Sequence, residues 1–243
     1  MKRATPPEKS TPLESFSQTA QLTPRSQRQI VDVYLTLAST AASAVGGHIT
    51  VERLPFIEDW SILLVLGAFV LGAAVFLSPA TEQNLPRRRT MLWGVGWVSG
   101  ILMHSAVAPL MYYGQADIVY MALGIAIALF ASFAVAVMTS SRSQVIYATG
   151  AAAFAISSLS WIGLLGLIFP SRILWDTSLL VGLAVPGVSA VVHTRNMLDE
   201  AASGVDIDPV TYALRFFGNL VNMFAHLLAL LRNNRERDEE DSR

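Results

Sequence analysis

The last apolar segment of the chain, residues 209–232, carries several polar side chains on one face. Read as a helix at about 100° per residue, four polar residues and a glycine fall within about 100° of one another, and apolar side chains cover most of the rest. The five are Arg215, Gly218, Asn219, Asn222 and His226. A guanidinium, two amides and an imidazole could line a path for ions, and histidine could also sense pH because its ordinary pKa is about 6.5.

Such a polar face is costly against lipid, so it should be turned towards other helices or towards water. The segment is therefore a candidate for the centre of a helical bundle. Amides and histidines in membrane helices also serve only as hydrogen-bonding contacts between helices, worth roughly 1 kcal/mol each. The sequence leaves both interpretations open.

The composition is that of an integral membrane protein. Of the 243 residues, 53% are hydrophobic and 14% are charged, with a net charge of −1 and a mean hydropathy of +0.47. A soluble domain carries nearly twice that charged fraction. The largest basic cluster is Arg87, Arg88 and Arg89, which argues against nucleic-acid binding. With no cysteine in the sequence, disulfides and thiolate metal sites are excluded.

Long uncharged runs predict about seven membrane helices, since about 20 apolar residues cross a bilayer. The expected helices are 29–49, 60–78, 90–111, 118–138, 145–169, 173–192 and 209–232. We expect an all-α, polytopic membrane protein in which six helices surround the C-terminal one. Small residues in the first and third helices, including Gly47 and Gly100, permit close contact with neighbours. His104, in the third helix, is expected to be a packing residue rather than a ligand.

Two tails should flank the membrane domain. Residues 1–28 are rich in Ser, Thr, Pro and Gln and are expected to form a disordered cytoplasmic tail. The membrane domain would follow at 29–232, and a charged tail at 233–243. With the N-terminus in the cytoplasm, ten basic residues face that side and two, Arg53 and Arg172, face the other. The side of the C-terminal tail stays open, because 209–232 could cross fully or break near Arg215 and Gly218 and return.

Three parts of the chain together match a known pattern. They are Val33-Tyr34-Leu35-Thr36-Leu37 leading to Ala44-Val45-Gly46-Gly47-His48, the end of the sixth helix with its acidic connector, and Phe217-Gly218-Asn219-Leu220-Val221-Asn222-Met223-Phe224 with the charged tail. In their order and spacing, over about residues 28–232, they resemble the transmembrane Bax-inhibitor-motif family.

The resemblance implies a fold and a function. It implies six helices around a seventh, residence in the endoplasmic reticulum membrane, a pH-sensitive calcium leak and suppression of stress-induced cell death. The expected partners are membrane lipids and other membrane or cell-death regulatory proteins. Calcium would be a transported ion, and we expect no cofactor, no bound metal and no enzymatic activity.

The chain departs from the family at the two aspartates with which the leak is associated. One belongs to an Asp-Thr-Gln element at the end of helix six, where this chain has His193-Thr194-Arg195. The other belongs to an Asp-Phe-Ile-Asn-Leu-Phe element in helix seven, where this chain has Asn219. Calcium prefers several oxygen ligands, and imidazole is a poor substitute. We therefore expect the carboxylate-gated leak to be weak or absent.

Two alternatives follow from this departure. His193 and His226 could sense acidification without any carboxylate, although both could equally be capping or packing residues. Alternatively, the protein could be a non-conducting membrane adaptor of the same fold, which binds other proteins through its faces and tails.

Other seven-helix functions fit the sequence less well. A retinal protein needs a lysine for its Schiff base, and the lysines here are Lys2 and Lys9 in the tail. An intramembrane hydrolase would need a serine that meets a histidine, but Ser99 and His104 lie about 140° apart on one helix. A pair of Ser99 with His226 across two helices stays open.

Overall fold

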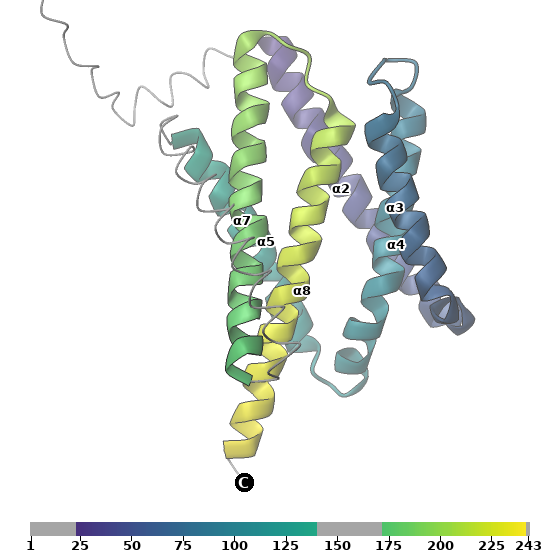
Figure 1. The fold of residues 1–243 in the computed structure, drawn as a ribbon, viewed down its shortest axis with the longest axis vertical. Helices are drawn as coiled ribbons and strands as arrows, with labels where there is room; N and C mark the ends of the chain where they lie inside the picture. Colours follow the sequence, from purple (N-terminus) through teal and green to yellow (C-terminus); the bar gives the residue numbers. More distant parts are fainter. Residues whose placement is uncertain (1–22, 140–171, 242–243) are drawn as a thin grey trace, which may run out of the picture.

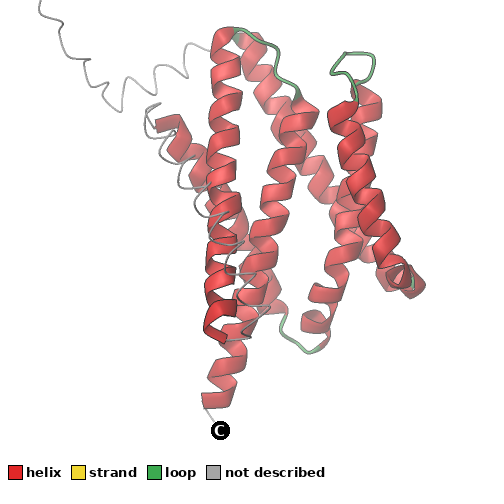
Figure 2. Cartoon of the chain, viewed as in Figure 1, coloured by secondary structure: helices red, strands yellow, loops and turns green. Residues whose placement is uncertain are grey.

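The computed structural model describes residues 23–139 and 172–241, and every regular element within these ranges is helical (Figure 2). The elements are α2 (Pro24–Arg53), the short 3-10 helix η1 (Pro55–Trp60), α3 (Ser61–Leu77), α4 (Leu85–Tyr112), α5 (Ala116–Thr139), α7 (Arg172–Ser203) and α8 (Pro209–Asp241) (Figure 1). The helix expected at 145–169 lies outside the described residues.

Five of these helices are long and apolar enough to cross a membrane: α2, α4, α5, α7 and α8. The sixth, α3, is strongly apolar but has 17 residues, so at about 1.5 Å per residue it is somewhat shorter than a bilayer core of about 30 Å. The expectation of an all-α, polytopic membrane protein is confirmed, and the number seven stays a prediction.

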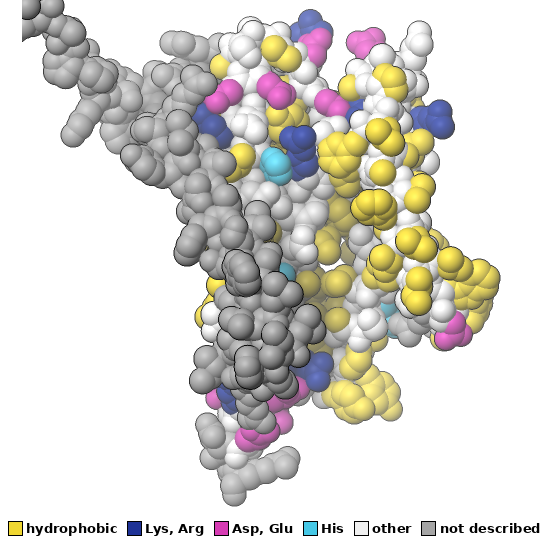
Figure 3. Space-filling model, viewed as in Figure 1, with side chains coloured by type: hydrophobic (Ala, Val, Ile, Leu, Met, Phe, Trp, Pro, Cys, Tyr) yellow, Lys and Arg dark blue, Asp and Glu magenta, His cyan; other side chains and the backbone are white. Residues whose placement is uncertain are grey.

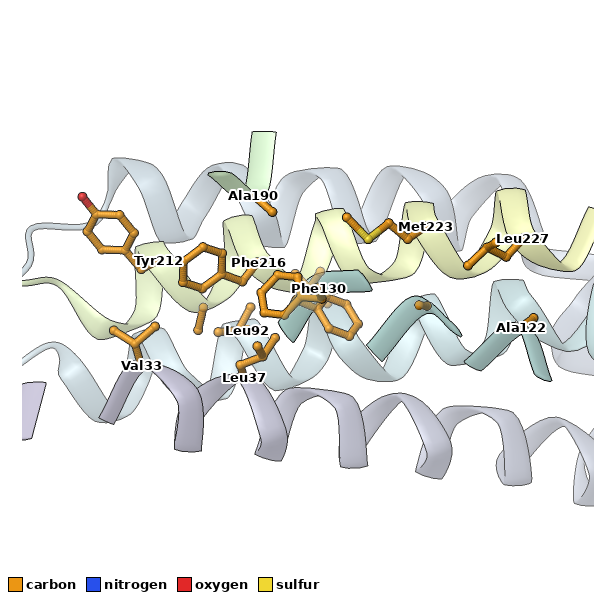
Figure 4. Close-up of a cluster of buried hydrophobic side chains, with 14 of the residues drawn as sticks. Val33, Leu37, Leu92, Ala122, Phe130, Ala190, Tyr212, Phe216, Met223 and Leu227 are labelled. Carbon is orange, nitrogen blue, oxygen red and sulfur yellow. The ribbon is translucent and has the colours of Figure 1, made fainter. Parts of the chain in front are cut away.

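Helix α8 lies at the centre of the described bundle. It packs against α2, α3, α4, α5 and α7, which are all the other α-helices that the structure describes. Its buried residues Phe216 and Met223 belong to the hydrophobic core cluster. Figure 4 shows Phe216 beside Phe130 of α5, and the two rings meet edge-on with centroids 5.4 Å apart. Val33 and Leu37 of α2 complete this part of the core.

Helix α8 also runs without a break from one end of the bundle to the other. Figure 1 places the start of α2, the α3–α4 loop and the α7–α8 connector at one end, and the end of α8 at the opposite end. Arg235, in the last turns of α8, forms an ion pair with Asp117 at the start of α5. The break considered near Arg215 and Gly218 is absent, because both residues lie inside one continuous helix.

Several helix boundaries differ from those expected. Helix α4 begins at Leu85 rather than at residue 90, and α7 continues to Ser203 rather than ending at residue 192. Helix α2 begins at Pro24, before residue 29, because Thr23 caps it by accepting a hydrogen bond from the Ser26 amide, and proline suits the first helical position. It continues to Arg53. Helix α8 continues to Asp241, through most of the expected charged tail, where Arg232 and Glu236 pair one turn apart.

Helices α2 and α4 approach each other closely through glycines. A Cβ at Gly100 would overlap the carbonyl of Ala44, and one at Gly47 would overlap the carbonyl of Trp97. At Gly96 the nearest atom to such a Cβ would be the Thr40 carbonyl oxygen at 2.5 Å. The close contact expected from the small residues of these two helices is therefore confirmed.

Helix α3 presents an apolar outer face. Val75 is its one buried residue, whereas Ile62, Phe69 and Leu77 are each more than 70% exposed. The hydrophobic side chains gathered over this helix in Figure 3 form a band between charged ends. A lipid environment would cover such a face, as expected of a helix at the outside of a membrane bundle.

Candidate functional site

The two positions at which the resemblance implies aspartates lie on α7 and α8, two helices that pack against each other. His193 on α7 is half-buried, and its buried Nδ1 has no hydrogen-bond partner. Asn219 on α8 is 8% exposed, and its buried Nδ2 also lacks a partner. Buried polar groups are nearly always hydrogen-bonded, and each unsatisfied one costs roughly 1–3 kcal/mol. Both nitrogens are thus positioned to meet water or another polar group.

Arg215 adds a positive charge to this contact. It acts electrostatically on His193 across the two helices. Its guanidinium carbon lies 5.7 Å from the centroid of the Tyr212 ring and 5.9 Å from that of Phe76, both within the range of a cation–π interaction. These aromatic faces hold the charge beside the polar pair, where it would repel an approaching cation.

The other two polar members of this face, Asn222 and His226, differ from each other in their surroundings. Asn222 is exposed, and its carbonyl accepts a hydrogen bond of 2.8 Å from Nδ1 of His226. The His226 ring lies against Gly182 of α7, at a position where a Cβ would not fit. The expectation that the whole polar face turns inward is therefore corrected at Asn222, whereas Asn219 is buried and His226 lies against α7. The buried side of α8 is centred on Phe216, Met223 and Leu227, and Asn222 lies about 100° away from Met223.

The hydrolase pair considered from the sequence does not form. The Ser99 hydroxyl donates to the Val95 carbonyl of its own helix at 2.8 Å, whereas His226 donates to Asn222. Among residues 23–139 and 172–241, no three histidine, aspartate or glutamate side chains gather closely enough to hold a metal ion.

A polar network that the sequence did not predict lies at the end of the bundle where α8 begins. Arg88 of α4 is 2% exposed and reaches three other parts of the fold. Its Nη1 and Nη2 donate to the two carboxylate oxygens of Asp208 at 2.8 and 2.7 Å. Its Nη2 also donates to the Thr211 hydroxyl at 2.9 Å. Nε and Nη2 donate to the Val75 carbonyl, an acceptor in the last turn of α3.

Asp208 has a second role as the residue that caps α8. Its Oδ1 accepts a hydrogen bond from the Val210 amide at 3.2 Å, and Pro209 occupies the first helical position. Burial alone would raise the pKa of Asp208, but hydrogen bonds from Arg88 and Thr211 and the charge of Arg88 hold the pKa below its ordinary value. The carboxylate therefore stays ionised and ties the start of α8 to α4.

Further pairs at the same end join α2 to the rest. Arg89 binds both carboxylate oxygens of Asp32. Arg25 donates to Asp206 at 3.0 Å, and Gln29 donates to the same carboxylate at 3.0 Å. In the sequence, the run of three arginines indicated only which side faces the cytoplasm. The one local signal for the network was Asp208 followed by proline, which is typical of a helix start.

Comparison with known proteins agrees with this architecture. The model of the family described as "Inhibitor of apoptosis-promoting Bax1" matches residues 26–236. Bax inhibitor 1 of Drosophila melanogaster is 26% identical over 223 residues, covering 90% of this chain and 88% of the relative. Bax inhibitor 1 of Arabidopsis thaliana is 27% identical over 230 residues, covering 91% and 87%. Bax inhibitor 1 of Oryza sativa subsp. japonica is 27% identical over 237 residues, covering 95% and 90%.

The family match extends over most of the chain and includes every described membrane helix in whole or in large part. The multi-pass helical bundle, with its C-terminal helix at the centre, is the fold that the resemblance in the sequence implied. This chain belongs to the family of inhibitors of apoptosis-promoting Bax1.

Proposed function

We propose that this protein modulates calcium homeostasis at the endoplasmic reticulum membrane and suppresses stress-induced cell death, with its N-terminus in the cytoplasm. Family membership supports the proposal, because the family and its curated relatives carry names that refer to inhibition of Bax. The excess of basic residues in the N-terminal tail and the loops assigned to that side supports the orientation.

We further propose that the carboxylate-gated calcium leak of the family is weak in this member. The observation that carries this proposal is the arrangement at the α7–α8 contact. There, a buried amide and a half-buried imidazole occupy the two positions that resemblance assigns to aspartates, and Arg215 acts on the imidazole. Calcium binds carboxylate oxygens far better than neutral nitrogen groups, and a neighbouring guanidinium opposes it.

The proposal is tested by restoring the carboxylates. Full-length protein and the double variant His193→Asp, Asn219→Asp are reconstituted into calcium-loaded liposomes, and calcium release is followed at neutral and acidic pH. We expect little release from the natural protein and acid-dependent release from the double variant. Release by the natural protein that matches a family member with both aspartates would overturn the proposal.

A non-conducting adaptor is the second candidate function. It is favoured by the last turns of α8, where residues 234–240 are exposed and carry charges of both signs on a helix that extends beyond the core. The same flux assay separates the candidates, because an adaptor would remain silent even with both aspartates restored. Removal of residues 233–243 should then abolish binding of protein partners without changing calcium flux.

A further inference from the structure

Two histidines from different helices face each other near the far ends of α2 and α4. The Nδ1 atoms of His48 and His104 lie 3.3 Å apart, and the centroids of the two rings are 4.7 Å apart. The planes of the two rings are tilted by 47°, so the rings are not stacked face to face, and they meet through their Nδ1 atoms. The sequence showed each histidine as an isolated residue in its own helix.

The glycine contact between the helices holds this pair in place. Gly100 of α4 lies directly against the carbonyl of Ala44 on α2. His104 and His48 follow these two residues by four positions, so each ring lies one turn further along the same face. Trp97 of α4 also donates a hydrogen bond to the Thr50 hydroxyl of α2 at 3.3 Å. The spacing of the imidazoles is thus set by backbone packing.

The distance between the nitrogens fits a shared metal ion. Two nitrogens bound at about 2.0–2.1 Å to a tetrahedral Zn²⁺ lie about 3.3 Å apart. With no ion present, one Nδ1 can donate a hydrogen bond to the other at this distance. The observed separation of 3.3 Å is thus already that of two nitrogens on one metal ion, and an ion that replaces the shared proton needs no movement of the helices.

Glu52 places a carboxylate near the outer nitrogen of His48. Its Oε1 lies 3.8 Å from Nε2 of His48, one turn along α2. A carboxylate there favours the tautomer with the proton on Nε2, which leaves Nδ1 as the electron-pair donor that faces His104. Carboxylate, histidine and metal in this order are a recurring arrangement at zinc sites.

We propose that His48 and His104 form a binding site for a divalent transition-metal ion, with Zn²⁺ as the best match to the geometry. Imidazole nitrogen is a preferred ligand of Zn²⁺ and Cu²⁺ and a poor one of calcium. No third histidine, aspartate or glutamate in the described ranges joins the two as a ligand, so water or an external ligand completes the coordination. The His48 side chain is 23% exposed, which gives the ion access from solution.

The site is tested by direct titration. Tag-free, full-length protein in detergent is stripped with a chelator and titrated calorimetrically with Zn²⁺. We expect one ion to bind per chain, and the double variant His48→Gln, His104→Gln to lose roughly 10–100-fold or more in affinity. The matched control, His193→Gln with His226→Gln, removes the same number of imidazoles from α7 and α8 and should bind Zn²⁺ as the natural protein does.

Two further measurements keep the outcome clear if the double variant folds poorly. Glu52→Ala leaves both ligands in place and should weaken Zn²⁺ binding by roughly tenfold. The electron paramagnetic resonance spectrum of the Cu²⁺-loaded natural protein should show coupling to two imidazole nitrogens. Absence of Zn²⁺ binding by the natural protein, or equal binding by the His48/His104 and His193/His226 variants, would overturn the proposal. Neither result bears on calcium release through the α7–α8 contact.

Discussion

At the scale of single residues, Arg88 is held by enough partners to compensate its burial. Removal of a guanidinium from water costs several kcal/mol, and that cost is offset only when good hydrogen bonds replace the lost hydration. Arg88 makes five hydrogen bonds, to Asp208, Thr211 and Val75. Loss of its carboxylate partner would leave an uncompensated buried charge.

We therefore predict that Asp208→Asn destabilises the protein by about 3 kcal/mol. Asparagine keeps one acceptor oxygen, so the loss should lie at the low end for a broken buried pair. Thermal unfolding of the detergent-solubilised protein measures the effect. The control is Asp206→Asn on the same connector, whose pair with Arg25 is exposed and should contribute at most about 1 kcal/mol. Equal effects of the two variants would contradict the importance of burial.

The same carboxylate predicts how stability depends on pH. The pKa of Asp208 is lower in the folded protein than its ordinary value of 3.8. Its stabilising contribution is therefore complete above about pH 4 and is lost as the pH falls through the lower, folded-state pKa. The melting temperature of the natural protein should fall in that acidic range. For Asp208→Asn, the melting temperature should be lower at neutral pH and should fall less on acidification.

Contacts between residues on different helices could not be predicted from the sequence. Arg88 and Asp208 are 120 positions apart, and His48 and His104 are 56 apart. Periodicity places each residue on a face of its own helix, but it does not say which faces of two helices meet. The polar face around Asn219 was identified because all its members lie on one helix. Which of these members are buried and which are exposed is decided by the helices that pack against α8, and the sequence does not show those contacts.

At the scale of elements, the contact between α2 and α4 depends on the absence of side chains. Gly100 and Gly47 each lie against a carbonyl of the opposite helix. This close approach brings the two backbones into contact and sets the register of the pair. Small residues at such positions were recognisable in the sequence because they recur along two predicted helices.

We predict that Gly100→Ala destabilises the protein by about 1–3 kcal/mol, because the added methyl group must push α2 and α4 apart. The control is Gly124→Ala in α5, where a Cβ would have no atom within 4 Å. That change should be neutral or slightly stabilising, since alanine favours a helix over glycine by up to about 1 kcal/mol. Thermal unfolding of both variants provides the comparison. A more stable Gly100→Ala protein would show that the helices do not pack in this way.

The sequence predicted the positions of the helices better than it predicted the residues at which they begin and end. Apolar runs located the described membrane helices, but the ends of α2 and α8 lie in polar sequence. Thr23 and Pro24 extend α2 by capping, and charged pairs one turn apart extend α8. These local interactions stabilise helix without any apolar signal, so a prediction based on hydropathy ends too early at both places.

At the scale of the whole molecule, the last helix passes through the middle of the bundle as one unbroken span. Helix α8 packs against α7, and Arg215 near the start of α8 acts electrostatically on His193 of α7. The unbroken helix places the C-terminal end of the described chain opposite the end at which α2 begins, and we therefore claim that α8 crosses the membrane fully.

The most direct test of this claim uses the absence of cysteine from the sequence. Single cysteines at Thr81→Cys, Asp59→Cys and Asn234→Cys, all at exposed positions, are labelled in sealed vesicles with a reagent that does not cross the membrane. If α8 is one unbroken span, we expect Asn234→Cys to be labelled from the same side as Asp59→Cys and from the side opposite to Thr81→Cys. Labelling of Asn234→Cys from the same side as Thr81→Cys would contradict it.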